Sequence, residues 1–136
     1  MKRLLVVDDE PLVREALKRV LEGDTVRVEV ATDARTALAQ YKASGADLVI
    51  VDVIMPGMDG VEFIRALRIH DPAVRVIAIS GGGNFEIGGY RPEAVSTRAY
   101  LAAATKAGAD AVLAKPFGIE ELDAVVRPLL VGRSAH

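Results

Sequence analysis

The chain has 136 residues, of which 51% are hydrophobic and 26% are charged, with a formal net charge of -2 and no cysteine. This length and composition are typical of one globular domain, and the nearly balanced charge argues against binding to nucleic acid or to an anionic membrane. The lack of cysteine excludes disulfides and thiolate chemistry, and no apolar run reaches the roughly 20 residues of a membrane-spanning helix, so we expect a cytoplasmic protein.

Short apolar runs rich in β-branched residues alternate with segments of helical periodicity along the chain. In chain order we predict a strand at residues 4–7, a helix at 12–21, a strand at 26–30, a helix at 34–42, a strand at 48–51, a helix at 61–69, a strand at 74–79, a helix from 92 to 108, a strand at 111–114 and a helix from 119 towards 130. Pro128 should kink or end the last helix, because it removes a backbone hydrogen bond. We assign residues 1–131 to one domain and residues 132–136 to a short C-terminal tail.

Strands joined by helical crossovers form a parallel sheet with helices on both faces, so the sequence predicts an α/β, doubly wound fold with five parallel strands. Ligands of such sheets bind beyond the carboxyl ends of the strands. Polar residues follow four of the predicted strands, namely Asp8, Asp9 and Glu10 after the first, Asp52 after the third, Ser80 after the fourth, and Lys115 with Pro116 after the fifth. We expect these groups to meet at one edge of the sheet.

Each of these groups, taken alone, also has a simple structural interpretation. Acidic residues before Pro11 are common at the start of a helix, where an acid caps the first turn, and the other groups could be ordinary loop residues. Together, however, Asp8, Asp9 and Asp52 would repel one another by a few kcal/mol per pair at about 5 Å and an effective dielectric of about 20. A cation is therefore expected among them. Mg²⁺ is commonly held by a few carboxylates and a phosphate oxygen, with Lys115 as a second positive charge.

These residues, in this order, resemble the receiver domain of two-component response regulators. The segments that carry the resemblance are LLVVDDEP at 4–11, VDVIMPGMDG at 51–60, AISG at 78–81 and AGADAVLAKPF at 107–117. The resemblance covers essentially the whole chain and implies a flavodoxin-like (βα)5 fold with strand order 2-1-3-4-5. It also implies a signalling module that is phosphorylated by a histidine kinase or a histidine phosphotransfer protein and acts by contact with an output protein, whose identity stays open.

The resemblance assigns the phosphoacceptor and the metal site. In this family the phosphoacceptor is an aspartate at the end of the third strand, which is Asp52 here. Asp8 or Asp9, or both, would hold Mg²⁺ together with Asp52 and the backbone carbonyl of Ile54, with Mn²⁺ as an alternative ion. The implied chemistry is physically sound, because phosphoryl transfer needs mainly in-line positioning and neutralisation of the charge on the phosphoryl oxygens.

The resemblance also assigns the groups that bind the phosphoryl oxygens. Lys115 would contact one oxygen, and the Ser80 hydroxyl and the backbone N–H of Gly81 would contact others. A cis peptide bond would join Lys115 to Pro116, which only an X–Pro bond adopts at low cost.

The switch that reports phosphorylation should differ from the usual one. Val112 stands where the family commonly has an aromatic switch residue, so a switch should run through Ser80 and the loop that follows it. That loop, predicted at residues 81–91, contains five glycines. We expect residues 82–89 to be the most mobile internal segment before phosphorylation, because glycine has high backbone entropy.

An enzyme is the alternative from another functional class, namely a Mg²⁺-dependent phosphohydrolase with an aspartate nucleophile. Such enzymes use the same kinds of groups but typically carry an Asp-x-Asp motif, whereas Glu10 stands two residues after Asp8. Turnover would separate the two, because an enzyme releases many phosphates per chain and a receiver holds one. The sequence has two histidines, His70 and His136, of which the second is the last residue. These are too few for a serine–histidine catalytic triad with a well-placed base or for a histidine metal cluster. We expect no turnover of an external substrate.

Overall fold

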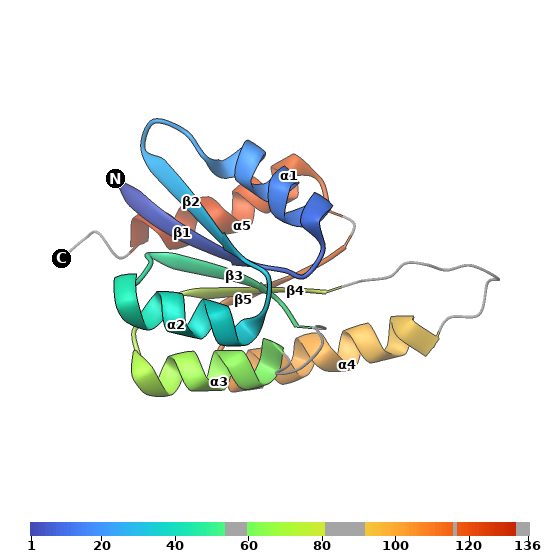
Figure 1. Cartoon of the computed structure of the whole chain (residues 1–136). Coiled ribbons are helices and arrows are strands. Elements are labelled where there is room, and N and C mark those ends of the chain that lie inside the picture. The colour runs from blue at the N-terminus through green and yellow to red at the C-terminus, as the bar shows by residue number, and fades with distance from the viewer. Residues whose placement is uncertain (54–59, 81–91, 116, 133–136) are drawn as a thin grey trace.

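The computed structural model describes residues 1–53, 60–80, 92–115 and 117–132, in which five strands alternate with five helices (Figure 1). In chain order the elements are β1 (Lys2–Val7), α1 (Pro11–Leu21), β2 (Val26–Ala31), α2 (Ala34–Ser44), β3 (Leu48–Asp52), α3 (Gly60–His70), β4 (Val76–Ser80), α4 (Pro92–Ala107), β5 (Ala111–Ala114) and α5 (Ile119–Gly132). All strands pair in parallel in the order β2-β1-β3-β4-β5. The predicted fold class and strand order are confirmed. Within the described ranges, no helix has the length and apolar character needed to cross a membrane.

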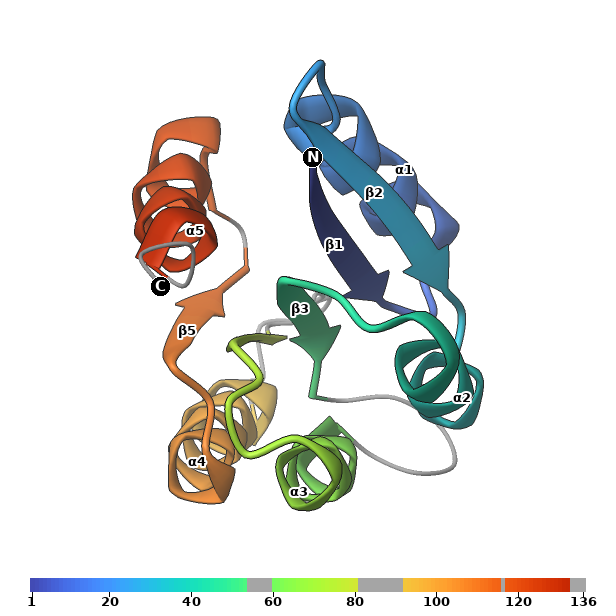
Figure 2. The same cartoon turned by 90° about the vertical axis from the view of Figure 1, so that its left-hand side faces the viewer.

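Successive residues of the central strands point to opposite faces of the sheet and enter two separate hydrophobic clusters. Leu4 of β1 packs in a cluster with residues of α1 and α5, whereas its neighbour Leu5 packs in a cluster with residues of α2, α3 and α4. Figure 2 shows these two groups of helices on opposite sides of the sheet. Because both faces are covered, the central strands are almost wholly apolar. In β3 and β4 the polar residue is the last one, Asp52 and Ser80 respectively.

A kink or an end was expected in the last helix at Pro128. The helix does not end there but continues to Gly132. Pro128 is exposed, while Val126 and Leu130 on either side of it are buried in the cluster beneath α5. The proline therefore removes one backbone hydrogen bond on the solvent side, and the apolar contacts that hold the helix to the sheet continue beyond it.

The register of the strands brings the polar strand ends together. Residue 7 lies opposite residue 51, residue 52 opposite residue 79, and residue 80 opposite residue 114. Asp8, Asp52, Ser80 and Lys115 therefore leave the sheet at the same edge. The backbone N–H of Lys115 donates to the carbonyl oxygen of Ser80 over 2.7 Å, which fixes the end of β5 against the end of β4.

Arg68, near the end of α3, fixes the opposite edge of the same strands. Its guanidinium donates to the carbonyl oxygens of Val74 and Gly108, which precede β4 and β5. It also lies 3.4 Å from a carboxylate oxygen of Asp110, and that oxygen accepts the backbone N–H of Val76 over 2.8 Å. Strands β4 and β5 are thus held at both ends.

Gly60, the first residue of α3, packs so closely on β3 that a side chain does not fit there. Its N–H donates to the carbonyl oxygen of Val53 over 3.2 Å, and an added Cβ atom would stand 2.6 Å from the carbonyl oxygen of Asp52. We predict that Gly60→Ala lowers the free energy of unfolding in urea by about 1–3 kcal/mol, because the backbone must shift. The control is Gly23→Ala, since no heavy atom of the described chain beyond its neighbours lies within 4 Å of that Cβ. Equal losses in both variants would contradict this account.

Candidate functional site

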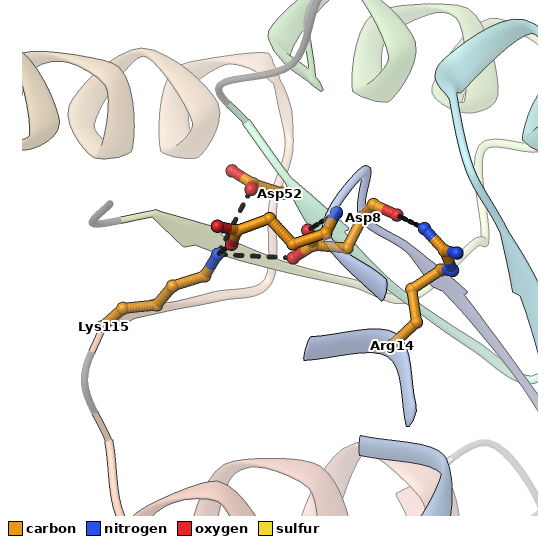
Figure 3. A network of polar contacts seen from close by, with 5 residues as sticks. Asp8, Arg14, Asp52 and Lys115 are labelled. Carbon is orange, nitrogen blue, oxygen red and sulfur yellow. Dashed lines mark hydrogen bonds and ion pairs between the residues drawn. The ribbon is translucent and has the colours of Figure 1, made fainter. Parts of the chain in front are cut away.

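Three carboxylates surround one ammonium group at the carboxyl edge of the sheet (Figure 3). The Nζ atom of Lys115 lies 3.3 Å from Oδ2 of Asp8 and 3.3 Å from Oδ2 of Asp52. It lies 3.1 Å from Oε1 of Glu10. The residues come from the ends of β1, β3 and β5 and from the entrance of α1, so the fold brings together the strand ends that the sequence had singled out.

The partners of Lys115 differ in their exposure to solvent. The side chains of Asp8 and Asp52 are 0% and 8% exposed, and that of Lys115 is 16% exposed. The Glu10 side chain is 60% exposed. Two carboxylates are thus buried, and a buried charge is tolerated only when it is paired and hydrogen-bonded. Lys115 supplies that pairing for both aspartates at once.

Burial raises the pKa of the Asp8 carboxyl above its ordinary value, and this effect outweighs the hydrogen bond from the N–H of Glu10 and the attraction of Lys115. For Lys115, burial by itself would lower the pKa, but the negative charges of Asp52, Asp8 and Glu10 together raise it. The lysine is therefore held in its charged form. The single positive charge of Lys115 does not balance the negative charges of three carboxylates. The site therefore favours the binding of a cation.

The loop between β1 and α1 is held by its own hydrogen bonds. Oδ1 of Asp8 accepts the backbone N–H of Glu10 over 2.9 Å, and the carbonyl oxygen of Asp8 accepts Nη1 of Arg14 over 2.9 Å (Figure 3). Glu10 is the N-cap residue of α1, yet its side chain makes no capping hydrogen bond in the described part of the chain. The Glu10 carboxylate contacts Lys115 instead. Helix capping alone thus does not account for this acidic run.

The carboxylates that could share a metal ion are those of Asp8, Glu10 and Asp52, each offering an oxygen within 4.8 Å of the others. Asp9, predicted as a ligand, is exposed and lies outside that group. Ile54, the other predicted ligand, lies outside the described residues. Glu10 was missing from the predicted ligands. Its backbone is extended, with φ -94° and ψ 116°, so its side chain returns to the side of Asp8, two residues before it.

Ser80 is wholly buried at the end of β4, and its Oγ atom has no hydrogen-bond partner in the described part of the chain. Buried hydroxyls nearly always have a partner, so this oxygen is suited to receive a polar ligand. Val112, predicted to stand at the family's switch position, is 37% exposed on β5. Gly81, Pro116 with its predicted cis bond, and the predicted mobile segment 82–89 lie outside the described residues.

The raised pKa of Asp8 leads to a prediction on stability in the presence of a metal chelator. Because the folded-state pKa exceeds the unfolded one, ionising Asp8 destabilises the fold, and this loss develops as the pH rises through the unfolded and then the folded pKa. We predict that Asp8→Asn is more stable than the wild type in urea at about pH 7. The difference should vanish below the ordinary pKa of aspartate, where the wild-type carboxyl is neutral. A less stable variant at neutral pH would contradict this.

The chain matches the family model described as response regulator receiver domain over residues 4–88. It is 40% identical over 135 residues to the KDP operon transcriptional regulatory protein KdpE of Escherichia coli, covering 99% of this chain and 54% of that protein. It is 39% identical over 128 residues to the response regulator MprA of Mycolicibacterium vanbaalenii, covering 94% of this chain and 50% of that protein. The chain spans about half the length of these curated relatives.

Solved structures share the fold over nearly the whole chain. The chemotaxis protein CheY4 of Vibrio cholerae superimposes with a TM-score of 0.76 and 29% identity, covering 96% of this chain and 99% of that chain. A CheY-like receiver domain protein of Methanospirillum hungatei gives a TM-score of 0.82 at 25% identity, covering 98% and 97%. With the fold, the acidic strand ends and more than half of the chain in agreement, this protein belongs to the family of response regulator receiver domains of two-component systems.

Proposed function

We propose that the chain accepts a phosphoryl group on Asp52 in a Mg²⁺-dependent reaction and then signals through contact with another protein. The donor would be a histidine kinase or a histidine phosphotransfer protein. The observation that carries this proposal is the buried Asp52 carboxylate, 3.3 Å from Nζ of Lys115, at the edge where the strand ends meet. This location gives a nucleophile shielded from bulk water, with a fixed positive charge beside it.

In the proposed step, a carboxylate oxygen of Asp52 attacks the phosphorus atom of a phosphohistidine. A P–O bond forms and the P–N bond breaks, with its electron pair remaining on the imidazole nitrogen. The product is an acyl phosphate on Asp52 and a free histidine on the donor. Lys115 would neutralise an equatorial phosphoryl oxygen, because such neutralisation is a main contribution that a protein makes to phosphoryl transfer. The hydroxyl of Ser80, which has no partner among the described residues, and the N–H of Gly81 are the further proposed contacts.

The donor set of the site fits a hard divalent cation. Asp8, Glu10 and Asp52 offer only oxygen ligands, and Mg²⁺ takes one or two carboxylates together with waters and phosphate oxygens. When bound, the ion would neutralise negative charge on the transferred group. Burial raises the pKa of Asp8, and a divalent cation beside this buried carboxylate would favour its ionised form. Asp9 and the carbonyl of Ile54 remain proposed ligands from the family pattern, and Mn²⁺ remains an alternative ion.

Signalling, not turnover, is the proposed outcome. Receiver domains are signalling modules, and the proposed reaction modifies the chain's own Asp52. A phosphohydrolase would need a second acid that protonates the leaving group, whereas the acids beside Asp52 are paired with Lys115. We therefore propose contact with an output protein, no contact with nucleic acid or membrane by this domain, and a cytoplasmic location.

The test of this function is intact-mass analysis after incubation with acetyl phosphate and Mg²⁺. We predict that the wild type gains the mass of one phosphoryl group and that Asp52→Ala gains none, because the nucleophilic oxygen is lost. Replacing Mg²⁺ by a chelator should slow the gain by at least about tenfold, since the carboxylates then repel the anionic donor.

Two outcomes would contradict the proposal. The first is a wild type that gains no phosphoryl group, or an Asp52→Ala variant that gains one equally fast. The second is continuous release of many phosphates per chain, which would favour the phosphohydrolase. Arg65→Gln serves as a control for a surface charge change, because Arg65 is exposed on α3 and makes no contact with the acidic group.

A further inference from the structure

Lys115 is shared among three carboxylates that are not equally free to leave it. Asp8 is wholly buried, and one of its carboxylate oxygens is engaged by the N–H of Glu10. Asp52 is the last residue of a buried strand, and its backbone is fixed by pairing with Ile79 of β4. Glu10 makes the shortest of the three contacts with Nζ, at 3.1 Å, but its side chain is 60% exposed.

Exposure decides which of these ion pairs can exchange at low cost. An ion pair with an exposed partner contributes little net stability, because water solvates the released carboxylate well. Releasing a buried carboxylate would leave its charge uncompensated, which costs far more. Glu10 also makes no capping hydrogen bond to α1 in the described part of the chain, so its release leaves the helix intact.

A phosphoryl group on Asp52 changes the negative charge that Lys115 must neutralise. The carboxylate carries one negative charge, and the acyl phosphate carries more, on oxygens that extend further from the strand. The ammonium group must then give up part of its present coordination. Of the carboxylates that contact it in the described structure, Glu10 is the one that can turn into solvent.

We propose that Glu10 is a positioning residue that holds Lys115 in the unphosphorylated chain and releases it to the phosphoryl group. This inference rests on the proposed phosphorylation of Asp52. The Glu10 carboxylate acts in two opposite directions. It attracts a divalent cation to the site, and it delays the transfer by competing with the phosphoryl group for Lys115.

These opposite effects predict a crossover in Glu10→Gln. At limiting Mg²⁺ the variant should be phosphorylated by acetyl phosphate more slowly than the wild type, because the cation binds more weakly. At saturating Mg²⁺ it should be faster, by about threefold to tenfold, because Lys115 is no longer held by a competing charge. The Mg²⁺ dissociation constant, measured by calorimetry without a phosphodonor, should rise by about tenfold.

Two variants separate this role from a general effect of charge or folding. Glu15→Gln removes an exposed carboxylate from the same helix, outside the acidic group, and should behave as the wild type. In a Lys115→Met background, Glu10→Gln should no longer accelerate phosphorylation, since the partner that it frees is absent. Circular dichroism of each variant checks that the fold is retained.

The outcomes distinguish the two proposals. A wild type that accepts no phosphoryl group overturns both of them. If Asp52 is phosphorylated but Glu10→Gln shows the same rates and the same Mg²⁺ dissociation constant as the wild type, only the role of Glu10 is overturned. The same acceleration in the Lys115→Met background would also overturn it, because Glu10 would then act on the donor's charge and not through Lys115.

Discussion

The ion pairs of Lys115 with two buried aspartates are the interaction on which the site depends. Neither Asp8 nor Asp52 could stay ionised beneath the surface without a nearby cation, and the lysine reaches them from a different strand. The pairing holds only if β1, β3 and β5 end at the same level. The register of the sheet aligns these strand ends. The hydrogen bond between the ends of β4 and β5, together with the contacts of Arg68 at the opposite edge, keeps them aligned. The site is therefore a property of the whole sheet and not of one loop.

Much of the fold could be predicted because the sequence repeats one physical pattern five times. Apolar runs such as residues 48–51 are too uniformly hydrophobic for a sheet with one face exposed to solvent. Helices must therefore cover both faces of the sheet. The convergence of Asp8, Asp52 and Lys115 followed from the parallel topology alone. The continuation of α5 past Pro128 could not be predicted in the same way, because it depends on the burial of Leu130 against the sheet.

The part of the site that the sequence did not reveal depends on short-range geometry. Whether Asp9 or Glu10 turns towards Asp52 is decided by a few backbone angles in the loop after β1, and the residue pattern does not encode those angles. The structure directs Glu10 to Lys115. That the Ser80 hydroxyl has no partner in the described ranges could likewise not be seen in the sequence, since a serine hydroxyl near the end of a strand usually finds a hydrogen-bond partner. Such details are set by packing around the loop and not by residue type.

The hydrogen bond from Arg14 to the β1–α1 loop has a consequence for how the sequences of such domains can diverge in evolution. The arginine holds the main-chain oxygen of residue 8 and makes no bond to its carboxylate. The other contact that holds the loop, from the N–H of Glu10 to Oδ1 of Asp8, needs only an oxygen acceptor, which the neutral side chain of asparagine also offers. A descendant sequence could exchange those acids for neutral residues and lose the chemistry while keeping the shape. Adaptor domains that present the same surface permanently, without a chemical signal, are therefore only a few substitutions away.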